Sequence, residues 1–149
     1  MPTAVYTGLI RAEPETVFEF VADAENNGAW HAHVRETSWI DEGPTRQGRR
    51  GRQLSRLWGR DWAFVAEVAE WDPPRHVAFQ VIEGMRIRTT IDVAPADGGG
   101  STVTLTVVTP RLPGPGVDAV ASRLLKLVTR GRENGDFRRL REALERPPR

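Results

Sequence analysis

The chain has 149 residues, a formal net charge of +1 and no cysteine. This length favours one domain, which can bury roughly two thirds of the surface that the unfolded chain would expose. The absence of cysteine excludes disulfide bonds, thiolate metal sites and cysteine nucleophiles, so we expect a cytoplasmic protein. Neither a signal peptide nor a membrane-spanning apolar segment is recognisable. We therefore predict a single soluble domain over residues 1–149, with a frayed tail at 147–149 and no membrane insertion.

The first predicted elements are a strand and a pair of short helices. Residues 4–12 are rich in β-branched and aromatic side chains, which predicts a strand with a bulge at Gly8. Pro14 is tolerated in the first turn of a helix, and the acidic residues beside it suit the positive end of the helix dipole. Apolar residues then recur at helical spacing from Val17 to Ala22. Residues 23–28 predict a break and the start of a second short helix.

A run of strands follows, separated by turns rich in glycine, proline and aspartate. The predicted strands span residues 33–41, 52–57, 62–71, 76–83, 85–94 and 102–109. In the strand from Met85, apolar side chains alternate with polar ones such as Arg86 and Arg88. This alternation is typical of an antiparallel sheet that has one dry face and one wet face. Helices can therefore cover only one side of the sheet.

The last predicted element is a long helix. The sequence RLPGPG at residues 111–116 breaks the final strand, and apolar and small residues recur at helical spacing over 117–146. Two prolines then end the helix. Gly131 and Gly135 each cost roughly 1 kcal/mol relative to alanine in a helix interior. They indicate either close backbone packing or space that is left for a ligand.

This order of elements resembles the polyketide cyclase/dehydrase family of the START-like (SRPBCC) superfamily. The resemblance rests on the segments IRAEPETVFEFVADAENNGAW, QGRRGR, VAEWDPPRHVAFQV, GGGSTVTLTV and FRRLREALE. It covers nearly the whole chain and implies an α+β helix-grip fold. In that fold a curved antiparallel sheet of about seven strands wraps around a long C-terminal helix and encloses an apolar cavity. Two short helices follow the first strand.

The resemblance implies binding of a hydrophobic or aromatic small molecule in the cavity between the sheet and the C-terminal helix, without a cofactor. Strand parity places Trp62, Phe64 and Phe79 on the inner face and Trp71 on the opposite one, where it would cover an edge. The predicted ligand-binding residues are Trp30, Trp62, Phe64, Phe79, Met85, Ile87, Leu105, Leu124, Val128 and Gly131. Core packing is the alternative for each aromatic residue, because a core and a cavity wall use the same side chains.

An enzyme is the alternative function, because the same superfamily includes aromatases and cyclases and its fold alone defines no reaction. A polyketide cyclase, aromatase or dehydratase would hold a poly-keto chain in the cavity and move protons with a general acid or base. His31 and His33 flank the end of the helical pair, and His31 is the candidate catalytic residue. The other interpretation is an exposed or capping side chain beside a structural Trp30. No third ligand follows the two histidines at a recognisable spacing, so no metal site is predicted.

The arginines are unevenly distributed along the chain. The segment 46–60 holds six arginines and no acidic residue before Asp61. Such a stripe can attract nucleic-acid phosphates. Arginines that alternate with other residues on a strand are more often its wet face, so we do not expect a nucleic-acid partner. The role of this segment stays open, as does the oligomeric state, monomer or homodimer.

Overall fold

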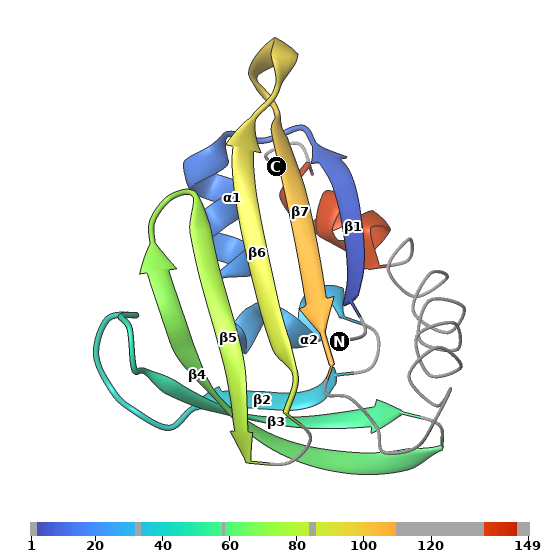
Figure 1. Ribbon diagram of the computed structural model, residues 1–149. Coiled ribbons are helices and arrows are strands. Elements are labelled where there is room, and N and C mark those ends of the chain that lie inside the picture. Colours follow the sequence, from blue (N-terminus) through green and yellow to red (C-terminus); the bar gives the residue numbers. More distant parts are fainter. Residues whose placement is uncertain (1–2, 32–33, 58, 84–85, 110–135, 146–149) are drawn as a thin grey trace.

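The computed structural model describes residues 3–31, 34–57, 59–83, 86–109 and 136–145. Seven strands of this part form one sheet in the order β1-β7-β6-β5-β4-β3-β2, and every neighbouring pair is antiparallel. The strands are β1 (Thr3–Ile10), β2 (Val34–Trp39), β3 (Arg50–Leu57), β4 (Arg60–Asp72), β5 (His76–Glu83), β6 (Arg88–Pro95) and β7 (Ser101–Val108). The sheet is strongly curved, and β2 and β3 cross the direction of the other strands (Figure 1). The largest shift from a predicted strand start is at β6, which begins at Arg88 instead of Met85.

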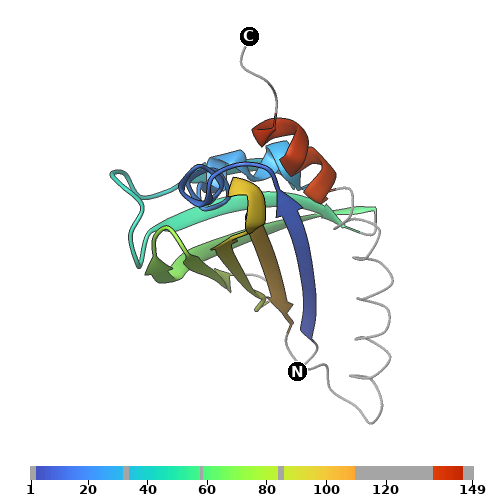
Figure 2. The ribbon, with the colours of Figure 1, turned by 90° about the horizontal axis from the view of Figure 1, so that it is seen from above.

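The described α-helices lie on the inner, concave side of this sheet. They are α1 (Pro14–Val21), α2 (Asn27–Trp30) and a C-terminal helix over residues 136–144, and the 3₁₀ turn η1 (Ala24–Asn26) joins the first two. Figure 2 shows α1, α2 and the C-terminal helix gathered on one side of the sheet. The predicted helix-grip fold is thereby confirmed. The rest of the predicted C-terminal helix and the predicted frayed tail at 147–149 lie outside the described residues.

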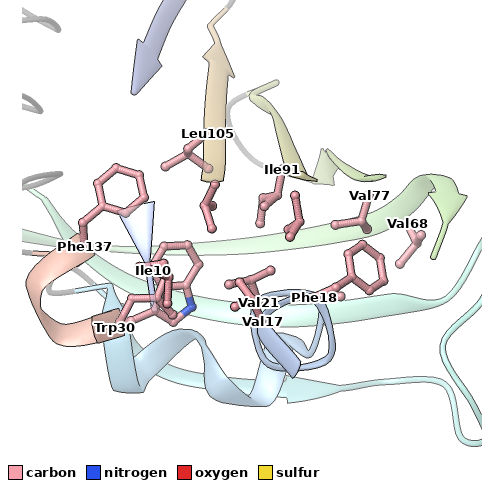
Figure 3. Close-up of a cluster of buried hydrophobic side chains, with 14 residues drawn as sticks. Ile10, Val17, Phe18, Val21, Trp30, Val68, Val77, Ile91, Leu105 and Phe137 are labelled. Atoms are coloured by element: carbon pink, nitrogen blue, oxygen red, sulfur yellow. The ribbon is translucent and has the colours of Figure 1, made fainter. Parts of the chain in front are cut away.

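The core lies between α1 and the concave face of the sheet. Pro14 starts α1 at a position where its missing N–H costs nothing, and Val17, Phe18 and Val21 form the buried face of the helix. In Figure 3 these side chains point toward residues of β4 to β7, while Trp30 and Phe137 close the other end. Burial of each large apolar side chain contributes roughly 1.5–3 kcal/mol to stability. The cluster comprises Ile10, Val17, Phe18, Val21, Ala22, Trp30, Val68, Val77, Ile91, Val93, Val103, Leu105, Phe137 and Leu140.

The predicted position of Trp71 on the outer face is wrong. The pairing of β4 with β5 shifts by one residue between Val68 and Glu70, so both Val68 and Trp71 face inward. The Trp71 ring packs against Phe18 of α1, with 5.3 Å between the ring centroids. The same shift turns Glu70 outward, where it is exposed. Strict alternation cannot anticipate such a bulge, because one extra residue reverses every position after it.

The predicted bulge at Gly8 is also wrong. The pairing of β1 with β7 runs without a register shift from Thr3 to Ile10. Gly8 serves close packing instead, because a Cβ atom at this position would lie 2.8 Å from Cδ1 of Phe137. The aromatic ring of the C-terminal helix therefore rests directly on the backbone of β1. In the described residues, no helix is both long and apolar enough to cross a lipid bilayer.

The contact between Gly8 and Phe137 predicts a steric effect of a single methyl group. We expect Gly8→Ala to lower the free energy of unfolding by about 1–3 kcal/mol, because the ring must move out of a packed position. Gly28→Ala is the matched control, because nothing lies within 4 Å of its Cβ position. Urea denaturation of both variants measures the difference. Equal stability of Gly8→Ala and wild type would contradict the packing role.

Candidate functional site

The concave face continues beyond the buried cluster as a partly exposed surface, which we call the open floor. It consists of Ala66, Phe79, Val81, Ile87, Thr89 and Val107. Adjacent strands contribute neighbouring members, since Ala66 pairs with Val81, Phe79 with Thr89, and Thr89 with Val107. All six side chains are of intermediate exposure, and Phe79 and Val107 also pack against the core. The open floor is thus an extension of the core that the described helices leave partly uncovered.

A polar network adjoins the open floor on β3. Asn27 of α2 donates from Nδ2 to Oε1 of Gln53 at 3.2 Å, and Gln53 donates from Nε2 to the hydroxyl of Ser55 at 2.9 Å. Ser55 is fully buried, and Gln53 is half-buried. The pairing of β3 with β4 places Gln53 opposite Phe64 and Ser55 opposite Trp62. The inner face of β3 therefore combines hydrogen-bonding groups with aromatic neighbours.

The three members of this network were not predicted as site residues. The sequence does contain a signal for two of them, because Arg52 and Arg56 alternate with Gln53 and Ser55 along the strand. If the arginines occupy the wet face, Gln53 and Ser55 must occupy the dry one. Asn27 gives no such signal, because its contact with Gln53 joins residues 26 positions apart.

A second polar pair joins α2 to the C-terminal helix. Nδ1 of His31 lies 3.0 Å from Oδ2 of Asp136, whose side chain is 1% exposed, whereas that of His31 is 12% exposed. His31 directly follows α2, and its backbone N–H donates to the carbonyl of Asn27. A carboxylate on one nitrogen of an imidazole fixes the orientation of the ring, as general-base sites require. Asp136 was missed, although it precedes Leu140 by four residues and so shares its buried helix face.

Trp30 is buried within the core. Core packing is the alternative to a ligand-binding role that the sequence analysis gives for this residue. Its exposed fraction is 0%, and its ring lies against that of His31, with centroids 3.6 Å apart and the ring planes tilted by 36°. The indole Nε1 is buried and has no hydrogen-bond partner among the described residues. An unpaired buried N–H group costs roughly 1–3 kcal/mol, which the large apolar area of the ring offsets.

The other predicted ligand-binding residues fall into three groups. Leu105 belongs to the buried core, and Phe64 is nearly buried beside Gln53. Phe79 and Ile87 lie on the open floor, and Trp62 is partly exposed with the Arg60 guanidinium 5.3 Å from its ring centroid. Met85, Leu124, Val128 and Gly131 lie outside the described residues, as does His33. In the part of the chain that the structure describes, no group of three potential ligands could hold a metal ion.

His76 occupies the opposite, convex face of the sheet. Its Nδ1 lies 2.6 Å from Oδ1 of Asp92 on β6, and its Nε2 lies 3.0 Å from Oε2 of Glu70 on β4. Arg88 also contacts Glu70. Hydrogen bonding to Asp92 raises the pKa of His76 above its ordinary value. Burial lowers this pKa in part, and the hydrogen bond to Glu70 raises it further. The hydrogen bond from His76 lowers the pKa of Glu70. This cluster links three strands and lies on the opposite face of the sheet from the open floor.

The arginine-rich segment mostly contacts its own surroundings. Arg49 donates to the carbonyl of Asp41 and to the hydroxyl of Thr45, and its guanidinium lies 3.9 Å from the centroid of the Trp39 ring. Arg46 donates to two loop carbonyls, while Arg50 and Arg56 pair with nearby aspartates. These contacts tie the loop between β2 and β3 to the sheet. Whether the segment also binds phosphates stays untested, and the absence of a nucleic-acid partner stays a prediction.

A curved antiparallel sheet that closes on a C-terminal helix over an apolar inner face defines a helix-grip protein of the START-like class. The sequence matches the family described as polyketide cyclase / dehydrase and lipid transport over residues 1–145. The chain therefore belongs to this family. The comparison with curated proteins gives no match.

Solved structures support the same fold at low sequence identity. The protein TTHA0849 from Thermus thermophilus is 22% identical, with 97% of each chain covered and a TM-score of 0.78. The Zhui aromatase/cyclase from Streptomyces sp. R1128 is 17% identical, with 97% of this chain and 93% of that chain covered and a TM-score of 0.76. A START superfamily protein from Mycobacterium smegmatis is 15% identical, with 96% and 97% covered and a TM-score of 0.68.

The His76 cluster predicts a pH dependence of stability. A pKa that is raised on folding gives stabilisation that is complete below the unfolded pKa, roughly 6.5, and is lost as the pH rises through the folded value. We expect wild type to lose about 0.5 kcal/mol relative to His76→Gln between pH 6 and pH 9. Urea denaturation at both pH values measures this difference, which should shrink in 1 M salt. Parallel pH profiles of the two proteins would contradict the role of the cluster.

Proposed function

We propose that this protein binds a hydrophobic or aromatic small molecule on the open floor, between the sheet and the C-terminal helix. The observation that carries the proposal is the continuity of partly exposed apolar side chains with the buried core. Small-molecule sites in proteins are mostly apolar and contain a few oriented polar groups. Phe79 and Val81 would supply the apolar contact, and Gln53 lies on the same concave face. The family, whose description includes lipid transport, supports a ligand of this kind.

Native mass spectrometry and calorimetry with aromatic ketones, fatty acids and sterols test for binding. The sharpest variant is Val81→Arg, because a charged side chain on the open floor must be desolvated when an apolar ligand covers it. We expect at least a tenfold loss of affinity with little change in stability, since an arginine can extend its charged end toward water.

Val5→Arg provides the matched control, because Val5 lies on β1 and is 60% exposed on the outer face. Its affinity for the same ligand should equal that of wild type. An equal loss in both variants would indicate a general effect of charge or stability. Unchanged affinity in Val81→Arg would place the ligand elsewhere and contradict the proposal.

A second candidate function, a polyketide cyclase, aromatase or dehydratase, rests on the His31–Asp136 pair. The pair brings the predicted catalytic histidine into contact with a buried carboxylate from the other end of the chain. Asp136 would act as a positioning residue, and His31 would accept and return a proton during ring closure or water elimination of a poly-keto substrate. The Zhui aromatase/cyclase has the same fold, although its low identity to this chain supports the fold alone.

Under this second function, His31→Ala should lower turnover of a synthetic poly-keto thioester by at least about 100-fold. Affinity for an apolar probe should stay within about twofold of wild type, because His31 would act on the proton and not on the apolar contact. His76→Gln is the control, since it alters a histidine on the convex face. Full turnover in His31→Ala would exclude the acid/base role.

A further inference from the structure

Gln53 is held from two sides on the concave face of the sheet. Asn27 of α2 bonds one atom of its amide, and Ser55, two residues along β3, bonds the other. Both bonds keep the amide in one plane and one position. The residue is nevertheless of intermediate exposure, so Gln53 is not sealed within the core. An oriented polar group within an aromatic surface is the usual device by which a site selects among apolar ligands.

The hydrogen-bond inventory of this amide leaves one donor unused. A glutamine amide has two N–H groups, and Ser55 accepts only one of them. The register partners of Gln53 do not accept the other in the described structure. Phe64 has no acceptor in its side chain, and the Thr37 hydroxyl, which keeps its acceptor lone pairs, makes its hydrogen bond with the carbonyl of Ala24 and not with Gln53.

One N–H group of Gln53 is also left unused if the side-chain amides of Asn27 and Gln53 are both flipped. Oxygen and nitrogen of an amide are assigned from the hydrogen-bond network. In the reversed arrangement, Gln53 would donate to Asn27 and accept from the hydroxyl of Ser55. One N–H group of Gln53 is then again used within the network and one is again left over. The unused donor is therefore a property of these three residues and not of one assignment.

We propose that Gln53 is a specificity-determining residue, and that its unused N–H group binds an acceptor oxygen of the ligand. This inference rests on the proposed function and narrows its ligand class. The ligand is an aromatic or otherwise apolar molecule that carries a carbonyl or ether oxygen. A hydrocarbon of the same shape would displace water from the N–H group of Gln53 and offer no acceptor in its place. The unpaired N–H group would then lower the affinity.

The test compares two probes of nearly equal shape, 2-acetylnaphthalene and 2-isopropylnaphthalene, by isothermal titration calorimetry. The ketone has a carbonyl oxygen where the hydrocarbon has a methyl group. We expect wild type to bind the ketone about three- to tenfold more tightly, as one neutral hydrogen bond allows. The ratio of the two affinities is the readout, because it cancels effects on apolar contact that both probes share.

Two substitutions remove the donor in different ways. Gln53→Leu removes all polar atoms, and Gln53→Glu keeps the acceptors for Asn27 and Ser55 but has no N–H group. Both should lower the affinity ratio to about one or below. Gln47→Glu makes the same change of charge at an exposed loop position and should keep the wild-type ratio. A ratio that persists in Gln53→Leu would overturn the assignment of Gln53.

A measurement on wild type makes the test independent of the folding of any variant. In ¹⁵N-correlated spectra, the side-chain amide of Gln53 should shift with the ketone and much less with the hydrocarbon. Equal affinities together with equal shifts would overturn the role of Gln53 while leaving the proposed binding function intact. Failure of both probes to bind at millimolar concentration would contradict that function and this inference with it.

Discussion

The contact of Phe137 with the backbone of β1 fixes the C-terminal helix, and much of the remaining arrangement depends on it. Because Gly8 has no side chain, the ring can lie against the strand. The helix is then held further by Arg141, which donates to the carbonyl of Leu9, and by Glu145, which accepts from the backbone of Arg11. In this position Asp136 reaches His31. One missing side chain on an edge strand therefore helps to set the geometry of the polar pair at the same end of the core.

The division between buried cluster and open floor follows in part from the sizes of α1 and α2. Helix α1 has eight residues and α2 only four, whereas β4 has thirteen. At a rise of about 1.5 Å per helical residue and 3.3 Å per strand residue, these helices cannot cover the full length of such a strand. Among the described residues, the apolar side chains beyond these two helices are of intermediate exposure. A surface of this kind favours a ligand as its cover, because the ligand completes the burial that the helices begin.

The sequence predicts the order of elements and most of the inner face, because alternation in β6 and β7 is regular and the resemblance to the family extends along the chain. The prediction for Trp71 was wrong, because a bulge in β4 moves its side chain to the inner face. Gln53 could have been placed inside from the arginines beside it. The contact between His31 and Asp136 could not, because it joins residues 105 positions apart through the packing of two helices. Local patterns specify faces, whereas contacts between distant segments depend on tertiary packing.

The two inner polar groups are connected through a single turn of helix. Asn27 begins α2 and bonds Gln53, and His31 follows its end and bonds Asp136. The backbone N–H of His31 donates to the carbonyl of Asn27 at 2.8 Å, so the backbones that carry the two side chains are held together. A ligand oxygen held by Gln53 would therefore have a fixed relation to His31. If the protein is a carrier, this relation limits only the orientation of its ligand. If it is an enzyme, the same relation would decide which carbon of the substrate exchanges its proton, because general acid/base catalysis needs the base within hydrogen-bond reach.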